Sequence, residues 1–161
     1  MKKNKGSIAI LGGMGPQASA KMLEVMVSMA AREFGAKNTE DFPEIILFSV
    51  PFADFISSKK NTHRAKFLLR EKIDFLNNMD VSTTAIACNT AHIMIEDLQA
   101  VSKAPFVSMI DAVTDEVKKQ DLKKVGILAT PSAIKSKLFQ RALSGCGIET
   151  VVPRRGSLYG N

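Results

Sequence analysis

A pentapeptide at residues 88–92 (CNTAH) combines the side chains that acid–base chemistry at a carbon atom would use. Cys88 follows the apolar run 82–87, so it is expected at the carboxyl edge of a sheet, where open α/β folds bind ligands. The positive end of a following helix would favour the thiolate over the thiol. Asn89 and Thr90 add short polar side chains that can bind a carboxylate or the helix end. The plainer alternative for Cys88 is a small buried hydrophobic residue.

A glycine-rich segment at residues 12–16 (GGMGP) follows the apolar run 7–11. Its continuation matches the G-x-G-x-x-A spacing of a dinucleotide-binding loop. Such a loop also needs an acidic residue at the end of the second strand, to bind the ribose. That strand ends with residues 49–51 (SVP), so a nicotinamide cofactor is disfavoured. Two interpretations remain: the N–H groups at the start of the next helix hold a small anion such as a carboxylate, or the loop is a tight turn without a ligand.

The remaining candidate groups carry less chemistry. His92 can orient or protonate a group near Cys88, although a histidine on a helix surface is the commoner case. His63 has no supporting partners. Neither histidine has a second ligand at a productive spacing, so no metal site is predicted. No lysine of a phosphate-binding loop follows the glycines. Cys146, which lies between two glycines, is interpreted as a small buried hydrophobic residue.

The elements that would position these groups alternate along the chain. Short apolar runs predict strands at residues 7–11, 44–50, 82–87, 105–110, 124–129 and 148–152. Apolar residues at helical spacing predict helices from Pro16 towards Phe34, over 65–76, over 91–101, after a cap at Asp111, and from Pro131 to the glycines at 145 and 147. This alternation predicts the α/β class, with a parallel sheet flanked by helices.

The same pattern predicts two lobes of unequal completeness. We expect a first α/β lobe at residues 1–117, which carries Cys88, and an incomplete second lobe at residues 118–161. The second lobe is called incomplete because its two strands cannot form a sheet with a core of its own.

Composition restricts the class of protein. The chain has 161 residues, of which 45% are hydrophobic and 24% charged, as in globular domains. The net charge of +6 arises in residues 118–161, which carry 9 basic and 2 acidic side chains, whereas residues 1–117 carry 13 and 14. With no Trp and one Tyr, a nucleic-acid partner is not predicted. No apolar run suits a membrane span or a secretory signal, which favours the cytoplasm.

Three ordered motifs resemble the aspartate/glutamate racemase family, nearest to its aspartate racemases. They are residues 10–16 (ILGGMGP), 88–92 (CNTAH) and 126–131 (GILATP), and the similarity runs from about residue 7 to residue 153. The resemblance implies two pseudo-symmetric α/β lobes that face each other, a reaction without a cofactor, and a small dicarboxylate amino acid as substrate. In that family one cysteine thiolate removes the α-proton, and the opposite thiol returns a proton to the other face.

Carried over to this sequence, the resemblance makes Cys88 the first catalytic cysteine. The residues that it assigns to binding of the substrate carboxylates are Met14, Gly15, Asn89, Thr90 and Thr130. Two groups on opposite faces of the α-carbon are needed because one acid–base group cannot serve both stereochemical directions. The resemblance implies neither a metal nor a membrane partner, and a homodimer stays open.

Two departures from the family pattern change what is expected of activity. The family's second cysteine lies in a Gly-Cys-Thr-Glu type motif further along, which this chain ends before reaching, and Cys146 has a different context. Aspartate racemases also carry an arginine after an aspartate in the loop beyond residue 51, where this chain has Asp54 followed by Phe55. We therefore expect a truncated, impaired racemase whose specificity for aspartate stays open, with a less acidic substrate as one alternative. The alternatives are a single-cysteine isomerase or decarboxylase acting on a dicarboxylate such as a malonate, and an inactive fragment that binds a carboxylate.

Overall fold

The structure is a computed structural model and describes residues 6–52 and 59–153. The chain divides into two compact units, Met1–Val107 and Ser108–Asn161. The lobe boundary predicted after residue 117 falls inside helix α4 (Met109–Lys119), which belongs to the second unit.

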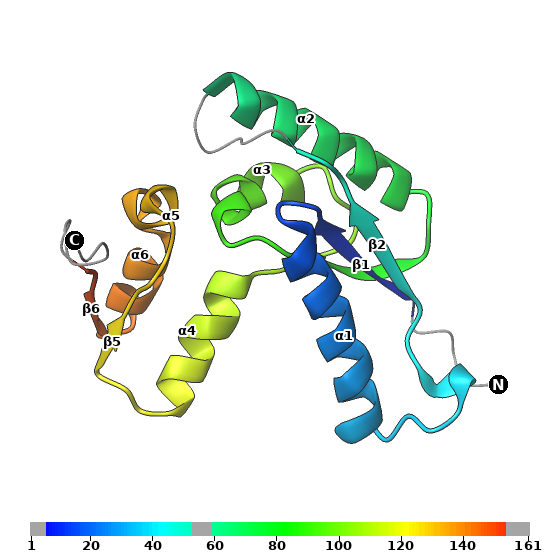
Figure 1. The fold of residues 1–161 in the computed structure, drawn as a ribbon, viewed down its shortest axis with the longest axis horizontal. Helices are drawn as coiled ribbons and strands as arrows, with labels where there is room; N and C mark the ends of the chain where they lie inside the picture. The colour runs from blue at the N-terminus through cyan, green and yellow to red at the C-terminus, as the bar shows by residue number, and fades with distance from the viewer. Residues whose placement is uncertain (1–5, 53–58, 154–161) are drawn as a thin grey trace, which may run out of the picture. The chain divides into compact units, whose positions relative to one another are not determined.

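The first unit is built on a four-stranded parallel sheet (Figure 1). Its strands are β1 (Ser7–Gly12), β2 (Ile45–Ser49), β3 (Val81–Ile86) and β4 (Phe106–Val107), in the spatial order β2-β1-β3-β4. β1 is interior to the sheet, and its residue Leu11 pairs with Phe48 of β2 and with Ile86 of β3. Parallel neighbours are joined by crossover connections, usually helices, so the predicted α/β sheet flanked by helices is confirmed.

The larger core lies between the sheet and helices α2 (Lys59–Leu76) and α3 (Ile95–Gln99). Its buried members are Ala9, Leu11, Ala65, Leu69, Ile73, Leu76, Ile86, Ala91, Met94 and Leu98. The four from α2 recur at helical spacing, which confirms the apolar face predicted for residues 65–76. Two others come from a 3-10 turn, η2 (Thr90–Met94), which precedes α3.

Helix α1 (Pro16–Arg32) covers the opposite face of the sheet. Ile10 alternates with the core residues Ala9 and Leu11 along β1 and is also fully buried. α1 packs on β1 and β2, and Figure 1 shows α1 and α2 on opposite sides of these strands. A second 3-10 turn, η1 (Thr39–Asp41), lies between α1 and β2.

The segment after β3 differs from the helix predicted over residues 91–101. It begins as the five-residue 3-10 turn η2 and continues as the five-residue helix α3. The field of a helix end is the sum of many aligned peptide dipoles, and a 3-10 turn this short supplies few of them. Cys88 is followed by a 3-10 turn and a short helix in place of the regular helix predicted there.

The strand predicted at residues 105–110 is also shorter than expected. β4 spans only Phe106–Val107, and α4 begins at Met109. Ser108 is the N-cap of α4, because its hydroxyl accepts a hydrogen bond of 3.2 Å from the N–H of Asp111. The prediction that Asp111 caps this helix is therefore wrong, since Asp111 supplies the amide that the cap satisfies.

The second unit contains α4 and two further helices, α5 (Pro131–Ser136) and α6 (Leu138–Gly145). Its strands β5 (Lys124–Gly126) and β6 (Glu149–Val151) are parallel, and both are shorter than the strands predicted there. The single helix predicted from residue 131 is divided at Lys137, whose φ of +58° lies in the left-handed region. A residue in that conformation cannot continue a right-handed helix.

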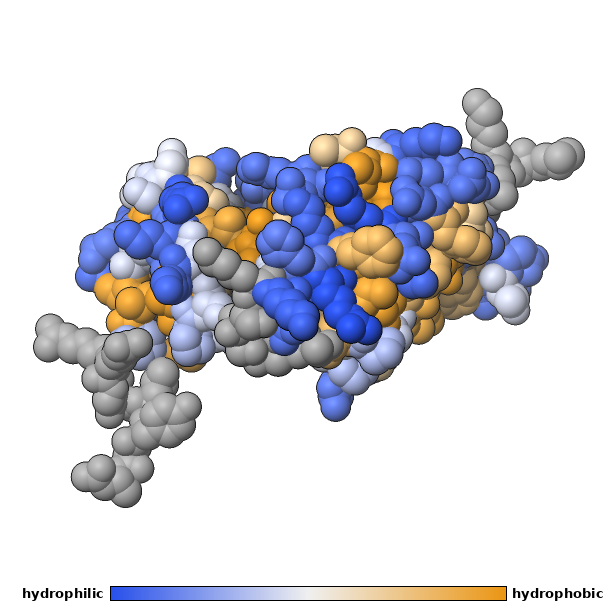
Figure 2. All heavy atoms as spheres, turned by 90° about the horizontal axis from the view of Figure 1, so that it is seen from above, coloured by the Kyte–Doolittle hydropathy of each residue, from blue (hydrophilic) through white to orange (hydrophobic). Residues whose placement is uncertain are grey.

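The surface carries apolar side chains among the charged ones (Figure 2). Phe34 is 82% exposed and Phe67 is 62% exposed in the first unit, and Leu128 is 81% exposed in the second. Large apolar side chains at the surface are available for association when they form a patch. Over residues 6–52 and 59–153, no helix is both long enough and apolar enough to cross a membrane.

Candidate active site

The glycine loop and Cys88 leave the sheet at the same edge. Leu11 and Ile86 are paired near the ends of β1 and β3, and the N–H of Ala87 donates to the carbonyl oxygen of Leu11 at 2.9 Å. Met14 and Cys88, just past these strand ends, are both half-buried and pack against the larger core. The carboxyl ends of two adjacent parallel strands thus bring together two segments that lie far apart in the chain.

The first two glycines of the loop are required by close packing. A Cβ on Gly12 would lie 2.2 Å from Oγ of Ser19, and a Cβ on Gly13 would lie 2.1 Å from the carbonyl oxygen of Val50. Gly13 also has a φ of +94°, which residues with a side chain rarely adopt. The N–H of Val50 donates to the carbonyl oxygen of Gly12 at 3.1 Å, so the loop closes over the end of β2.

Ser19 is a part of this loop that the sequence interpretation missed. It is buried in α1, and its Oγ accepts a hydrogen bond of 2.9 Å from the N–H of Gly13. The same hydroxyl donates to the carbonyl oxygen of Gly15 at 3.4 Å. The Gly13 amide therefore binds a side chain of this protein, and a tight turn accounts for Gly12 and Gly13. The available signal was a small polar residue one turn into the helix that follows the glycines.

The two ends of the loop have different surroundings. Met14 packs against the larger core, whereas Gly15 is exposed and is the N-cap residue of α1, with no side chain to cap it. Pro16 follows at the first helical position, as the sequence predicts.

Cys88 and its neighbours differ in exposure. Cys88 is half-buried, Asn89 is exposed and Thr90 is buried. Asn89 precedes η2, and its side chain makes no capping hydrogen bond to the turn. Two roles were predicted for Asn89. It does not cap the helix end, and its binding of a carboxylate stays a prediction.

His92 is buried, and the expectation of a histidine on a helix surface is wrong. Its side chain is 2% exposed, and Nδ1 lies 2.9 Å from the carbonyl oxygen of Cys88. A carbonyl oxygen only accepts hydrogen bonds, so Nδ1 is the nitrogen that carries the hydrogen. The backbone N–H of His92 donates to the carbonyl oxygen of Asn89 at 3.2 Å. The turn after β3 folds His92 inward because η2 replaces the regular helix on which its exposed position was predicted.

The other predicted residues belong to other segments of the chain. Thr130 belongs to the second unit, where its hydroxyl accepts a hydrogen bond of 3.2 Å from the N–H of Ala133 and caps α5. Cys146 is the C-cap of α6, also in the second unit, and it is exposed, so the prediction that it is a buried hydrophobic residue is wrong. Asp54 and Phe55 lie outside the described residues. In the described part of the chain, no group of three or more His, Cys, Asp or Glu side chains is arranged to hold a metal ion.

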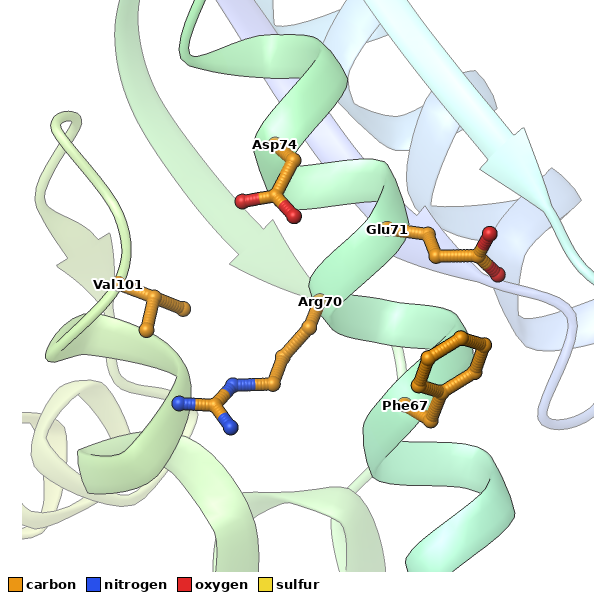
Figure 3. Close-up of a pocket in the computed structure, with 5 residues that line it drawn as sticks. All are labelled: Phe67, Arg70, Glu71, Asp74 and Val101. Carbon is orange, nitrogen blue, oxygen red and sulfur yellow. The ribbon is translucent and has the colours of Figure 1, made fainter.

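A separate hollow of about 310 Å³ lies along α2 (Figure 3). The residues that line it are Phe67, Arg70, Glu71, Asp74 and Val101. In Figure 3, Arg70 extends from α2 towards the side of Val101, and Glu71 points the other way. The hollow shares no residue with the glycine loop or with residues 88–92.

A model of the Asp/Glu/hydantoin racemase family matches residues 11–160, a range that includes the glycine loop and residues 88–92. The chain belongs to this family. Among curated relatives, the broad specificity amino-acid racemase RacX of Bacillus subtilis is 26% identical over 144 residues, which cover 89% of this chain and 63% of RacX. The glutamate racemase of Halothermothrix orenii is 33% identical over 98 residues, which cover 60% of this chain and 39% of that enzyme.

Solved structures of racemase-family proteins have the same fold. An aspartate racemase homologue from Pyrococcus horikoshii superposes with a TM-score of 0.79 at 27% identity, over 93% of this chain and 65% of its own. The aspartate racemase of Picrophilus torridus gives 0.77 at 29% identity, over 93% of this chain and 64% of its own. The chain thus spans less than two thirds of the length of these family members.

Proposed function

We propose that this racemase-family chain acts on the α-proton of an amino acid through the thiol of Cys88, without a cofactor. The observation that carries the proposal is the position of Cys88 at the carboxyl edge of the sheet, beside the end of β1 from which the glycine loop starts. That edge is where ligands bind in open α/β sheets. The names of the relatives, which are amino-acid, glutamate and aspartate racemases, favour the same reaction.

The proposed step moves one proton. The Cys88 thiolate removes the α-proton and becomes a thiol, and the electron pair of the broken C–H bond stays on the substrate as a carbanion delocalised into its carboxylate. Return of a proton to the same face restores the starting enantiomer, and return to the other face inverts it. With no cofactor as an electron sink, the charge must be stabilised by fixed dipoles and hydrogen-bond donors.

The residues proposed to bind the substrate come from three segments. Met14 and Gly15 belong to the loop after β1, and Asn89 and Thr90 follow Cys88 directly. Thr130, which belongs to the second unit, is the remaining residue proposed to bind the substrate. A dicarboxylate amino acid is the expected substrate class, and Phe55 in place of the arginine of aspartate racemases favours a less acidic member of that class.

Hydrogen exchange in deuterated water tests this proposal. Each enantiomer of aspartate, glutamate and a neutral amino acid is incubated with the protein, and α-deuterium is followed by mass spectrometry, with chirality measured separately. We expect α-deuterium in one enantiomer with retention, because Cys88 serves one face. Cys88→Ser should lower the exchange rate at least about 100-fold, the usual scale of an acid–base group. Cys146→Ser is the matched control and should leave it unchanged. Exchange at the normal rate in Cys88→Ser would refute the proposal.

A single-thiol decarboxylation is the second candidate. It is favoured by the surroundings of the two cysteines, since Cys88 is half-buried at the carboxyl edge of its sheet and Cys146 is an exposed helix C-cap. Loss of carbon dioxide leaves a carbanion that needs one proton donor, which Cys88 can be. Release of carbon dioxide from a substituted malonate, without α-deuterium in amino acids, would favour this reaction. Binding of these acids with neither reaction would instead indicate an inactive carboxylate-binding protein.

A further inference from the structure

The buried ring of His92 contacts the backbone of Cys88, and the proposed chemistry leaves it without a role. An imidazole carries two polar nitrogens, and burying it costs free energy unless they are hydrogen-bonded. His92 is 2% exposed, and it is among the largest fully buried side chains of the described residues. An apolar side chain would fill this position without that cost, so the buried imidazole is there for its hydrogen bonds.

The ring contacts the backbone of the proposed catalytic residue. Nδ1 of His92 lies 2.9 Å from the carbonyl oxygen of Cys88, and the backbone N–H of His92 donates to the carbonyl oxygen of Asn89. Two consecutive carbonyl groups are thus held by one residue, one by its ring and one by its amide. Cys88 comes after the last ladder residue of β3, where the strand no longer restrains the backbone.

Fixing this carbonyl restricts the direction of the thiol. A planar peptide leaves only φ and ψ free at Cys88, and the carbonyl direction is set by ψ. The strand restrains the chain before Cys88, through the hydrogen bond from the N–H of Ala87 to the carbonyl oxygen of Leu11. The His92 ring restrains it after Cys88. The direction of the Cα–Cβ bond between these two restraints is therefore fixed, and the thiol keeps only the staggered positions of χ1.

We propose that His92 is a positioning residue, whose Nδ1–H holds the Cys88 carbonyl and so aims the thiol at the sheet edge. The role rests on the proposed function of Cys88, but the geometry of the thiol can be measured without any substrate. His92 acts through the backbone of Cys88 and takes no proton from the substrate.

Three variants of His92 distinguish the effect of its hydrogen bond from the effect of its side-chain volume. His92→Asn retains an N–H donor near the position of Nδ1, whereas His92→Gln carries its donor further out and His92→Leu has none. The matched control is His63→Leu, because His63 is exposed on α2. Circular dichroism identifies the variants that fold.

The first readout is the alkylation of Cys88 by iodoacetamide, with the exposed Cys146 as a reference in the same molecule. Loss of the His92 bond loosens the turn, so local opening exposes Cys88 more often. The ratio of the two alkylation rates should rise at least about threefold in His92→Leu and stay near the normal value in His92→Asn and His63→Leu. An unchanged ratio in His92→Leu would overturn the proposal. If His92→Leu does not fold, a normal alkylation ratio in both His92→Asn and His92→Gln would overturn the proposal.

The second readout is α-proton exchange. A misplaced thiol lowers kcat with little change in KM, and we expect at least about a tenfold loss in His92→Leu, with most of it restored in His92→Asn. Equal losses in both variants would overturn the positioning role. If the normal protein exchanges no α-proton, the proposed function fails, and the alkylation ratio still decides the role of His92.

Discussion

The hydroxyl of Ser19 fills the space in which a side chain at position 12 would lie. A Cβ on Gly12 would be 2.2 Å from Oγ and 2.7 Å from Cβ of Ser19, whereas the same hydroxyl accepts a hydrogen bond from the N–H of Gly13. A glycine and a serine seven residues apart thus form one packing unit that joins the end of β1 to the first turns of α1. The shape of the glycine loop depends on this pair.

Gly12→Ala should lower the free energy of unfolding by about 1–3 kcal/mol, the usual cost of overpacking. Adding Ser19→Gly removes both clashing atoms, so the double variant should lose less than the two single losses combined, by about 0.5–3 kcal/mol. Urea unfolding measures all three. Gly145→Ala is the control, because a Cβ there meets nothing within 4 Å, and it should not destabilise the protein. Additive losses would show that Gly12 and Ser19 are not coupled.

Ligand protection tests whether Cys88 lies in the binding site. A dicarboxylate amino acid at ten times its Kd should slow the alkylation of Cys88 about tenfold, since only the free protein reacts. Alkylation of Cys146 should not change, because it is the exposed C-cap of α6 and is not among the proposed binding residues. Peptide mass spectrometry resolves the two cysteines. Equal protection of both, or of neither at a saturating ligand concentration, would contradict the assignment of the site.

The N-cap of α4 gives a test of the correction made there. Ser108→Ala should cost about 1 kcal/mol of stability, because the amide of Asp111 loses its hydrogen-bond acceptor. Ser108→Asp restores an acceptor and should recover most of that loss. Asp111→Ala removes only a favourable charge near the helix N-terminus, so it should cost about 0.3–1 kcal/mol. Thermal unfolding compares the three variants, and a larger loss in Asp111→Ala than in Ser108→Ala would favour Asp111 as the cap.

The ion pair between Lys66 of α2 and Asp97 of α3 predicts a pH dependence of stability. The hydrogen bond from Lys66, with its charge and that of Arg70, holds the pKa of the Asp97 carboxyl below its ordinary value of 3.8. The folded state therefore favours the ionised carboxyl. The resulting stabilisation is present above pH 3.8 and is lost as the pH falls through the lowered pKa.

The Asp97→Asn variant should accordingly have a lower free energy of unfolding than the normal protein at pH 6. At pH 2 the two free energies should be nearly equal. Urea unfolding at a series of pH values measures this convergence. Asp115→Asn is the control, since Asp115 pairs with Lys118 within a single helix at 3.5 Å and links no two elements. If the difference in stability does not change with pH, the ion pair is not its cause.

Local patterns in the sequence were sufficient for the class of fold. Residues 65, 69, 73 and 76 repeat at the period of a helix, and the apolar runs that became β1, β2 and β3 have the length and flanking breaks of buried strands. Strands that alternate with helices can pair in parallel only through crossovers, so the α/β class follows from periods that each segment carries by itself. The motifs at residues 10–16 and 88–92 likewise led to the family without any contact being known.

The tertiary structure alone decided how the candidate site is assembled. The order β2-β1-β3-β4 is what places the loop that contains Met14 beside Cys88, and it depends on pairings between residues that are distant in sequence. The burial of His92 and the packing of Ser19 against Gly12 could not be predicted from the spacing of apolar residues. That spacing shows which residues share a face of an element, but not which other element packs against that face. Contacts of this kind arise only when the whole chain has packed, since each depends on the positions of several elements at once.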